Sequence, residues 1–332
     1  MKNVYLASVA SKSGKSVLSL GLATNYPGKA GFYKPFRESL VQVGDELMDQ
    51  DAVLMSEVLK ISEGRKLSPF VYDFNEPIPM SRLTAGYHEL CEDKEFMIIE
   101  GSRDPATGSA HKLSHIDIAK ALNAPIVLVA TPTRQSIDMM FLFKELCRQN
   151  KIKILGTVIN RSSGLPERSF LEGHGIKVLG EIPEMSELKT FRVSEISDKM
   201  DAKVIAGGKG MENIVETMLV GAMSIQAALG YMRRTKRKAM ITGGDRTEML
   251  LAALSTDTSC IIVTGGIKPS HTVLSRADEI GVPVLMTTED TLHVTEIIEH
   301  LIARIDPTDK DKIAHVRNVV RDNVDLNAIF GL

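Results

Sequence analysis

The sequence has little of what marks several protein classes. Its 332 residues include only three cysteines, Cys91, Cys147 and Cys260, which lie far apart and follow no metal-ligand spacing. We therefore expect neither a disulfide framework nor a zinc site, and we interpret the three as small buried hydrophobic side chains. The formal net charge is only −2, so the chain has no basic field for nucleic acid or an anionic membrane.

Long apolar runs are also missing. No stretch reaches the roughly 20 apolar residues of a membrane-spanning helix, and the opening "MKNVYLASVA" is too short and too polar for a signal peptide. We therefore expect a cytoplasmic protein without a nucleic-acid or membrane partner. What is present, 43% hydrophobic and 25% charged residues, is typical of a soluble chain of about two domains.

Short and almost wholly apolar runs alternate with helical patterns in the first half of the chain. They cover residues 3–9, 30–36, 95–101, 125–131 and 153–161. Runs of this kind are typical of strands that are buried on both faces of a parallel sheet. We therefore predict an α/β fold with helices on both faces of a parallel sheet, and a binding site beyond the carboxyl ends of the strands.

The stretch "VYLASVASKSGKSVLSLGLA", residues 4–23, has the strand, loop and helix of a phosphate-binding loop. Gly14 lets backbone N–H groups approach phosphate oxygens, Lys15 supplies a positive charge, and Ser16 can offer its hydroxyl to Mg²⁺. Val9 stands where the usual GxxxxGK[ST] pattern has its first glycine, so an ordinary strand, turn and helix is the alternative. The nucleotide-binding residues predicted in this loop are Ser13, Gly14, Lys15, Ser16 and Val17.

A carboxylate follows another buried run, "FMIIEGSRD" at residues 96–104. Glu100 ends a strand that we expect beside the phosphate loop, where a carboxylate can hold Mg²⁺ directly or through water. The alternative is a carboxylate that caps the following loop. The predicted metal ligands are therefore Ser16 and Glu100.

Several ordered motifs within residues 1–185 together resemble dethiobiotin synthetase. They are "SGKS" at 13–16, "GFYKPFR" at 31–37, "IIEGS" at 98–102, "GTVINR" at 156–161 and "VLGEIPE" at 178–184. The resemblance implies a P-loop NTPase sheet, ATP and Mg²⁺ as cofactors, and a homodimer. Two features depart from that family: the loop has only Ser11 or Ser13 where the family has an aspartate, and "GSRDPATGSAHK" lacks an early second glycine.

The resemblance also implies roles for individual residues. Lys15 would bind the nucleotide phosphates, and Lys34 would project toward the reacting phosphoryl group, which makes these two lysines the catalytic candidates. Asn160 would recognise the adenine, because an amide both donates and accepts hydrogen bonds. Arg161 follows it, and Pro183 would lie along the base.

The alternating pattern restarts in the second half, after a connector. The strand-like runs "KVIAGG", "KAMITGGDR", "CIIVTGGIKPS" and "VPVLMTTED" alternate with helical patterns near 211–229, 246–255, 271–280 and 291–305. We therefore predict a second, smaller α/β domain. The predicted division is residues 1–185, a linker at 186–202, and a domain at 203–332 with a C-terminal helix.

The second domain resembles the DRTGG domain over about residues 203–305, through "ITGGDRTEMLLAAL" and "IIVTGGIKPSHTVLSRADEIGVPVLMTTEDT". Glu248 and Met249 replace the two glycines that name the domain. The pairing of the two domains is similar to the region ahead of the catalytic part of long phosphate acetyltransferases, and it implies no acetyl transfer by this chain. Arg246 either pairs with Asp245 to order the turn or binds a small anionic effector beside the Gly265–Gly266 turn.

Three functions are compatible with these residues. The first is a regulatory sensor that binds Mg-ATP and hydrolyses it slowly or not at all. The second is an ATP-dependent ligase in which Lys34 and Lys15 stabilise phosphoryl transfer onto a carboxylic acid. The third is a protein with a purely structural nucleotide.

His111 and His115, four residues apart, are interpreted as solvated helix residues.

Overall fold

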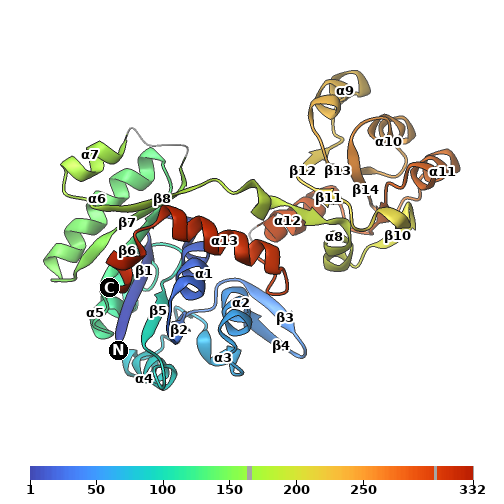
Figure 1. The fold of residues 1–332 in the computed structure, drawn as a ribbon. Coiled ribbons are helices and arrows are strands. Elements are labelled where there is room, and N and C mark those ends of the chain that lie inside the picture. The colour runs from blue at the N-terminus through green and yellow to red at the C-terminus, as the bar shows by residue number, and fades with distance from the viewer. Residues whose placement is uncertain (163–166, 303–304, 332) are drawn as a thin grey trace. The chain divides into compact units, whose positions relative to one another are not determined.

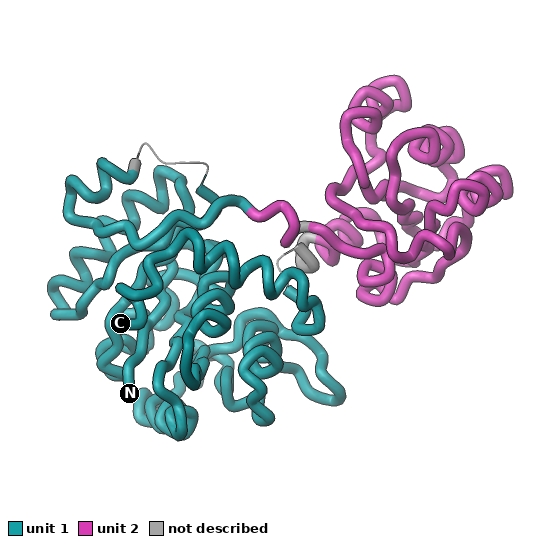
Figure 2. The backbone as a smooth tube through the Cα atoms, in the orientation of Figure 1, with its two compact units in different colours: residues 1–184, 305–332 teal, residues 185–304 magenta. Residues whose placement is uncertain are grey.

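The computed structural model of the chain describes residues 1–162, 167–302 and 305–331, which form two compact units (Figures 1 and 2). The first unit contains Met1–Glu184 and Ile305–Leu332, and the second contains Met185–Arg304. Across the described ranges, no helix combines the length and the apolar character needed to cross a bilayer.

A six-stranded parallel sheet forms the centre of the first unit, as the buried apolar runs predict. Its strands occur in the order β2-β5-β1-β6-β7-β8. All residues of β2, β5 and β6 are buried, because helices cover both faces of the sheet. The bounds are β1 Lys2–Ser8, β2 Ala30–Tyr33, β5 Phe96–Glu100, β6 Ile126–Ala130, β7 Ile154–Ser162 and β8 Val178–Pro183.

The helices of the first unit divide between the two faces of this sheet. On one face, α1, α2 and α13 contact the strands, and α4 to α7 pack on the other with a continuous apolar core. A two-stranded hairpin, β3 Leu40–Val43 and β4 Glu46–Asp49, leads directly into α2. The helices are α1 Lys15–Asn25, α2 Gln50–Leu59, α3 Gly64–Leu67, α4 Met80–Leu90, α5 His115–Ala121, α6 Arg134–Gln149, α7 Glu167–Gly173, α13 Lys310–Asn323 and α14 Leu326–Phe330.

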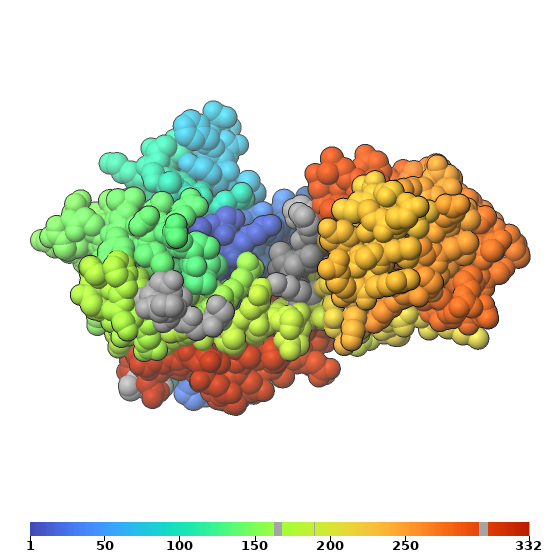
Figure 3. Space-filling view, turned by 90° about the horizontal axis from the view of Figure 1, so that it is seen from above, coloured from blue at the N-terminus to red at the C-terminus, as the bar shows by residue number. Residues whose placement is uncertain are grey.

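The end of the chain differs from the predicted division at 203–332. Residues 305–332 belong to the first unit, where α13 packs along α1 and α14 contacts β1. The apolar residues Val316, Val320 and Phe330 are buried there, and Figure 3 shows the C-terminal helices, in red, as part of the surface of this unit. Burial of this apolar stripe explains why a segment so distant in sequence returns to the first unit.

Close packing of α13 on α1 predicts that a normally favourable substitution is harmful. A Cβ atom at Gly21, inside α1, would lie 2.5 Å from Val320 Cβ. Ala usually stabilises a helix by about 1 kcal/mol over Gly, but here we expect Gly21→Ala to lower the free energy of unfolding by about 1–3 kcal/mol through overpacking. Urea unfolding followed by circular dichroism measures the change.

Gly230 is the matched control for that substitution, because it also lies inside a helix. Its nearest neighbour, Arg234 Nη2, would lie 3.7 Å from an added Cβ atom. Gly230→Ala should therefore stabilise by roughly 0.5–1 kcal/mol. An equally stabilising Gly21→Ala would mean that α13 does not pack on α1 in solution.

The second unit is a smaller α/β layer structure. Its five-stranded sheet has the order β10-β15-β14-β13-β12, with β12 to β15 parallel and β10 antiparallel. Helices α9, α10 and α11 pack on one face, and α8 and α12 pack on the other. The bounds are β9 Phe191–Arg192, α8 Val193–Met200, β10 Lys203–Ala206, β11 Ile214–Val215, β12 Thr217–Val220, α9 Ile225–Arg234, β13 Lys238–Gly243, α10 Thr247–Leu254, β14 Thr258–Thr264, α11 His271–Ile280, β15 Val284–Met286 and α12 Thr291–Ile302.

Two expectations for this region differ from the structure. Residues 186–202, expected as a linker, contain α8, whose Val193 and Ile196 are fully buried in the core of the second unit. The helix expected near 211–229 is instead β11, β12 and only the start of α9. The expected strands near 203, 238, 258 and 284 are all present.

Candidate functional site: a phosphate loop with a buried charge cluster

The loop between β1 and α1 is built around Gly14. Its φ angle of 96° places it in the left-handed region, which suits glycine. A Cβ atom at this position would lie 1.9 Å from Asn160 Nδ2, so only glycine fits. Ser13 braces the turn by donating from Oγ to the carbonyl of Ala10 at 2.5 Å. No side chain of the described residues caps the N-terminus of α1, so the first N–H groups of this helix can bind an anion.

Lys15 is the first residue of α1, and its side chain is held inside the site. It is 7% exposed, and Nζ donates to Ser8 Oγ at 2.9 Å. The Ser8 hydroxyl donates to the carbonyl of Arg103 at 2.8 Å, which ties β1 to the loop after β5. Burial lowers the pKa of Lys15 below its usual value. This ammonium has no carboxylate within ion-pair distance among the described residues, so a phosphate would be a favourable partner.

Glu100 lies at the end of β5, as predicted, and both of its oxygens accept hydrogen bonds. Ser16 donates to Oε1 at 3.2 Å, and Ser19 donates to Oε2 at 2.6 Å. Burial, together with the nearby charge of Asp51, raises the pKa of Glu100 to about 7. Without a cation, this carboxyl is therefore about half protonated near pH 7.

Asp51, in the first turn of α2, was not found by sequence reasoning. Burial raises its pKa, but the charge and hydrogen bond of Lys34, together with a hydrogen bond from Ser16, lower it below its usual value. The Ser16 hydroxyl thus lies between the carboxylates of Asp51 and Glu100, and its single proton can be donated to only one of them at a time. An Asp in the first turn of a helix was the available signal, although it resembles an ordinary helix start.

Lys34, at the end of β2, forms a buried ion-pair cluster. Its Nζ lies 2.6 Å from Asp51 Oδ2 and 3.1 Å from Asp49 Oδ2, and its side chain is 3% exposed. Although burial acts in the opposite direction, the charges of Asp51 and Asp49 raise the pKa of Lys34 above its usual value. The structure therefore brings Lys34, Lys15, Ser16 and Glu100 together, as the sequence predicts.

The residues present fit a hard divalent cation. Asp51, Glu100 and the Ser16 hydroxyl are oxygen donors of the kind that Mg²⁺ prefers. Two buried carboxylates beside one hydroxyl repel each other, as the raised pKa of Glu100 indicates, and a cation between them would relieve that repulsion. The protein supplies only two carboxylates; no group of three or more His, Cys, Asp or Glu side chains able to hold a metal exists in the described parts of the chain. Water and phosphate oxygens would have to complete the shell.

The residues predicted to hold the adenine lie at the ends of β7 and β8. Asn160 is 4% exposed and donates from Nδ2 to the carbonyl of Ser13 at 3.0 Å. Its carbonyl oxygen Oδ1 accepts no hydrogen bond within residues 1–162, 167–302 and 305–331. Arg161 has a left-handed backbone with φ of 58°, and Pro183 pairs with the end of β7. These contacts link the predicted base site directly to the phosphate loop.

His115 is not the solvated residue that its spacing suggested. It is fully buried beneath the loop after β5, and its Nε2 lies 3.1 Å from the carbonyl oxygen of Ser102. Burial, together with the charge of Lys15, lowers its pKa to about 3. His115 is therefore neutral at physiological pH and supports the loop from below. His111 contacts the ring of Phe74.

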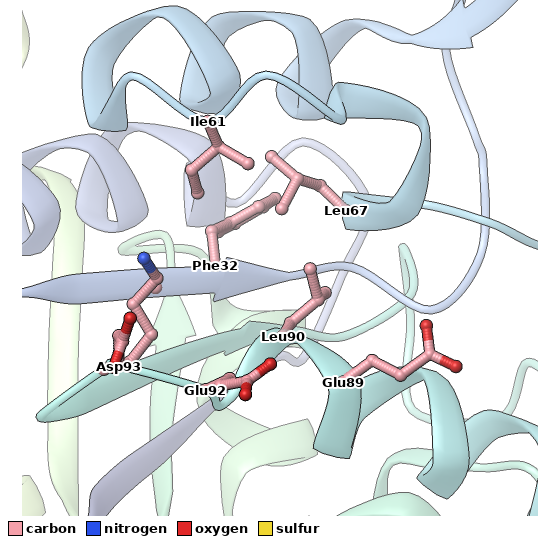
Figure 4. A pocket seen from close by; sticks show the side chains of 9 residues that line it. Phe32, Ile61, Leu67, Glu89, Leu90, Glu92 and Asp93 are labelled. Carbon is pink, nitrogen blue, oxygen red and sulfur yellow. The ribbon is translucent and has the colours of Figure 1, made fainter.

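A small cavity of about 250 Å³ lies elsewhere in the first unit. Figure 4 shows Ile61 and Leu67 facing Phe32 and Leu90 across it, with carboxylates at its rim. None of the predicted site residues lines it. Its lining residues are Gly31, Phe32, Ile61, Leu67, Glu89, Leu90, Glu92, Asp93 and Lys94.

In the second unit, the turn after β13 has an arginine that faces a backbone group. Arg246 Nη2 donates to the carbonyl of Met223 at 2.9 Å. An ion pair with Asp245 is absent from the described residues, so the interpretation in which the two residues pair is not supported. Gly265 and Gly266 both have positive φ angles, and their N–H groups donate to Glu289 and Thr287.

Two family matches cover nearly all of the chain. The AAA domain family matches residues 2–192, and the DRTGG domain matches residues 195–301. Among solved structures, the MinD cell division protein of Aquifex aeolicus covers 57% of this chain and 84% of its own, with 14% identity and a TM-score of 0.39. The CBS and DRTGG domains of Clostridium perfringens pyrophosphatase, complexed with the activator diadenosine tetraphosphate, cover 53% and 80%, with 16% identity and a TM-score of 0.32.

The curated relatives include phosphate acetyltransferases and a dethiobiotin synthetase. Phosphate acetyltransferase of Synechocystis sp. is 27% identical over 97% of this chain and 50% of its own length. The phosphate acetyltransferase of Escherichia coli is 21% identical over 99% of this chain and 52% of its own length. The chain therefore spans about half the length of these relatives. ATP-dependent dethiobiotin synthetase BioD of Bacillus velezensis is 24% identical over 60% of this chain and 94% of its own. The chain therefore belongs to the AAA domain family, as a dethiobiotin-synthetase-like P-loop domain joined to a DRTGG domain.

Proposed function

We propose that this protein binds Mg-ATP at the loop between β1 and α1 and acts as a nucleotide-dependent regulatory sensor in the cytoplasm. The observation that carries the proposal is the convergence of Lys15, Ser16, Lys34 and Glu100 on one loop at the free N-terminus of a helix. Two ammonium groups, free backbone N–H groups and cation ligands are the components that a triphosphate needs.

Each residue then has a definite role. Gly14 and Val17 lie on the loop and the first turn whose N–H groups would surround the β-phosphate, and Lys15 would leave Ser8 to pair with phosphate oxygens. Ser16, Glu100 and Asp51 would hold Mg²⁺, which neutralises triphosphate charge. The free Oδ1 of Asn160 would accept from the adenine amino group while Nδ2 keeps its bond to the loop. Arg161 and Pro183 would line the base.

The burial of Lys34 supports a sensor rather than a fast enzyme. Its ammonium is already neutralised by Asp51 and Asp49, so it is not free to stabilise charge on a transferring phosphoryl group without a rearrangement. The second candidate is an ATP-dependent ligase that activates a carboxylic acid. The retention of two lysines beside one phosphate loop favours it, since a binding protein needs only one.

The second unit would then report on a ligand of its own. The Arg246 guanidinium has no carboxylate partner among the described residues, and its planar donors suit a phosphate or carboxylate. We therefore propose a small anionic effector near Arg246, and a homodimer as the working assembly.

Isothermal calorimetry tests the proposal directly. Wild-type protein should bind ATP in the presence of Mg²⁺ and at least about tenfold more weakly in EDTA, because Asp51 and Glu100 repel an unaccompanied triphosphate. A parallel assay of phosphate release, with and without a panel of carboxylic acids, separates the two candidates. Release that only an acid triggers would favour the ligase, and absence of ATP binding would reject both.

A further inference from the structure

The two carboxylates that hold Lys34 differ in what else they bind. Asp49 has no exposed side-chain surface and caps α2. Its oxygens also accept from four backbone N–H groups, those of Glu38, Ser39, Asp51 and Ala52. Asp49 therefore has no accepting capacity left for another ligand, and it cannot turn away without opening both the hairpin end and the helix start.

Asp51 has the opposite character. Its side chain is 14% exposed, it has the shorter contact to Lys34 at 2.6 Å, and it lies beside Ser16. The charge of Lys15 also acts on Asp51, and the charges of Asp51 and Glu100 act on each other. It is the carboxylate of the pair that can change partners without disturbing the backbone.

We propose that Asp51 exchanges Lys34 for a divalent cation, and that Asp49 is the positioning residue that keeps Lys34 in the site during this exchange. The inference rests on the proposed function, because the cation is the one that would accompany ATP. Lys34 is then not permanently available to phosphate. Its ammonium is released only when a cation occupies Asp51.

The exchange follows from counting the donors of an ammonium group. Lys34 has three N–H donors, and in the structure they serve Asp49 and Asp51. Once a cation takes Asp51, the donor that served it is free for a phosphate oxygen, while the bond to Asp49 fixes the position of Nζ. The arrangement thereby couples cation binding to the appearance of a second positive charge facing the nucleotide.

Binding of Mn²⁺ alone, measured by electron paramagnetic resonance without nucleotide, tests the exchange. Lys34→Met removes the competitor for Asp51 and should tighten Mn²⁺ binding at least about tenfold. Asp49→Asn keeps one oxygen to cap α2 but loses the acceptor for the N–H groups of Glu38 and Ser39, so its fold is checked by circular dichroism. It leaves Asp51 as the sole carboxylate for Lys34 and should weaken Mn²⁺ binding at least about threefold. Lys66→Met, at an exposed lysine paired with Glu63, is the charge-matched control and should change nothing.

The double variant distinguishes positioning from a simple loss of charge. If Asp49 acts through Lys34, the Asp49→Asn substitution should have little effect in the Lys34→Met background, within about twofold. If the effects of Asp49→Asn and Lys34→Met on Mn²⁺ affinity simply add in the double variant, Asp49 does not act through Lys34. Equal Mn²⁺ affinity in wild type and both single variants, including no binding in any of them, overturns the exchange.

Two checks keep the test independent of folding and of the wider proposal. Lys34→Met leaves two buried carboxylates unpaired, so far-UV circular dichroism is used to check whether it is folded. If it is unfolded, the weaker Mn²⁺ binding expected for Asp49→Asn alone tests the exchange. Wild-type ATP binding is measured separately. If wild type binds Mg-ATP but Lys34→Met and Asp49→Asn do not change the Mn²⁺ affinity in opposite directions, the proposed function stands and the exchange is rejected.

Discussion

Lys15→Ala is expected to lower the affinity for Mg-ATP at least about 100-fold, which corresponds to roughly 3 kcal/mol of binding free energy. Lys15 begins α1, and its ammonium is buried beside the free N–H groups of that helix. A charge in such a low-dielectric position interacts with phosphate much more strongly than a charge in water does. Calorimetric titration with ATP and Mg²⁺ measures the loss.

The fold should survive this change. Among the described residues, Lys15 donates only to the neutral hydroxyl of Ser8, and no close ion pair there offsets its desolvation, in keeping with its lowered pKa. Replacement therefore leaves no directly paired carboxylate behind, and we expect unfolding to shift by less than about 1 kcal/mol. Lys120→Ala, at an exposed lysine in the last turn of α5, should leave ATP affinity unchanged. Retained affinity in Lys15→Ala would remove the loop from consideration as the triphosphate site.

The central strands could be predicted because the signal is local. Buried parallel strands have continuous apolar runs, and β1, β5 and β6 read that way in the sequence. The helix predicted near 211–229 was wrong because the prediction used the same local signal. Strands β11 and β12 are too short to show the two-residue period of a strand. The return of α13 to α1 depends on Val320 meeting Gly21, a pairing of distant residues that no local pattern contains.

The residues of the candidate site also differ in whether a local sequence pattern could predict them. Lys15, Ser16 and Glu100 occur at recognisable positions of a strand, loop and helix, and the structure gathers them. Asp49 is the N-cap of an ordinary helix and Asp51 lies in its first turn, where acidic residues are common in most proteins. Their contact with Lys34 becomes visible only when the end of β2 brings that lysine beside them, and the proposed exchange depends on this contact.

Glu100→Gln is expected to stabilise the cation-free protein at alkaline pH. The pKa of Glu100 is raised in the folded state from 4.5 to about 7, so its ionisation opposes folding. Below about pH 4.5 the group is neutral in both folded and unfolded chains, and the penalty is absent. The penalty grows as the pH rises toward 7 and reaches about 3 kcal/mol above it. Glutamine cannot ionise, so the variant should exceed wild type by up to that amount at pH 8 and match it near pH 4.

Glu100→Gln should also weaken the effect of Mg²⁺ on ATP binding. Higher stability together with weaker binding is the result that identifies Glu100 as a cation ligand. Loss of the Glu100 carboxylate removes a predicted cation ligand, so the tenfold gain in ATP affinity that we expect Mg²⁺ to give to wild type should largely disappear. Urea unfolding in EDTA at pH 4 and pH 8, with calorimetry at pH 8, measures both effects. Glu145→Gln, at an exposed glutamate paired with Arg148, should show neither. A variant that is less stable than wild type at both pH values would mean that Glu100 is a structural partner of Ser16 and Ser19 rather than a carboxylate held ready for a cation.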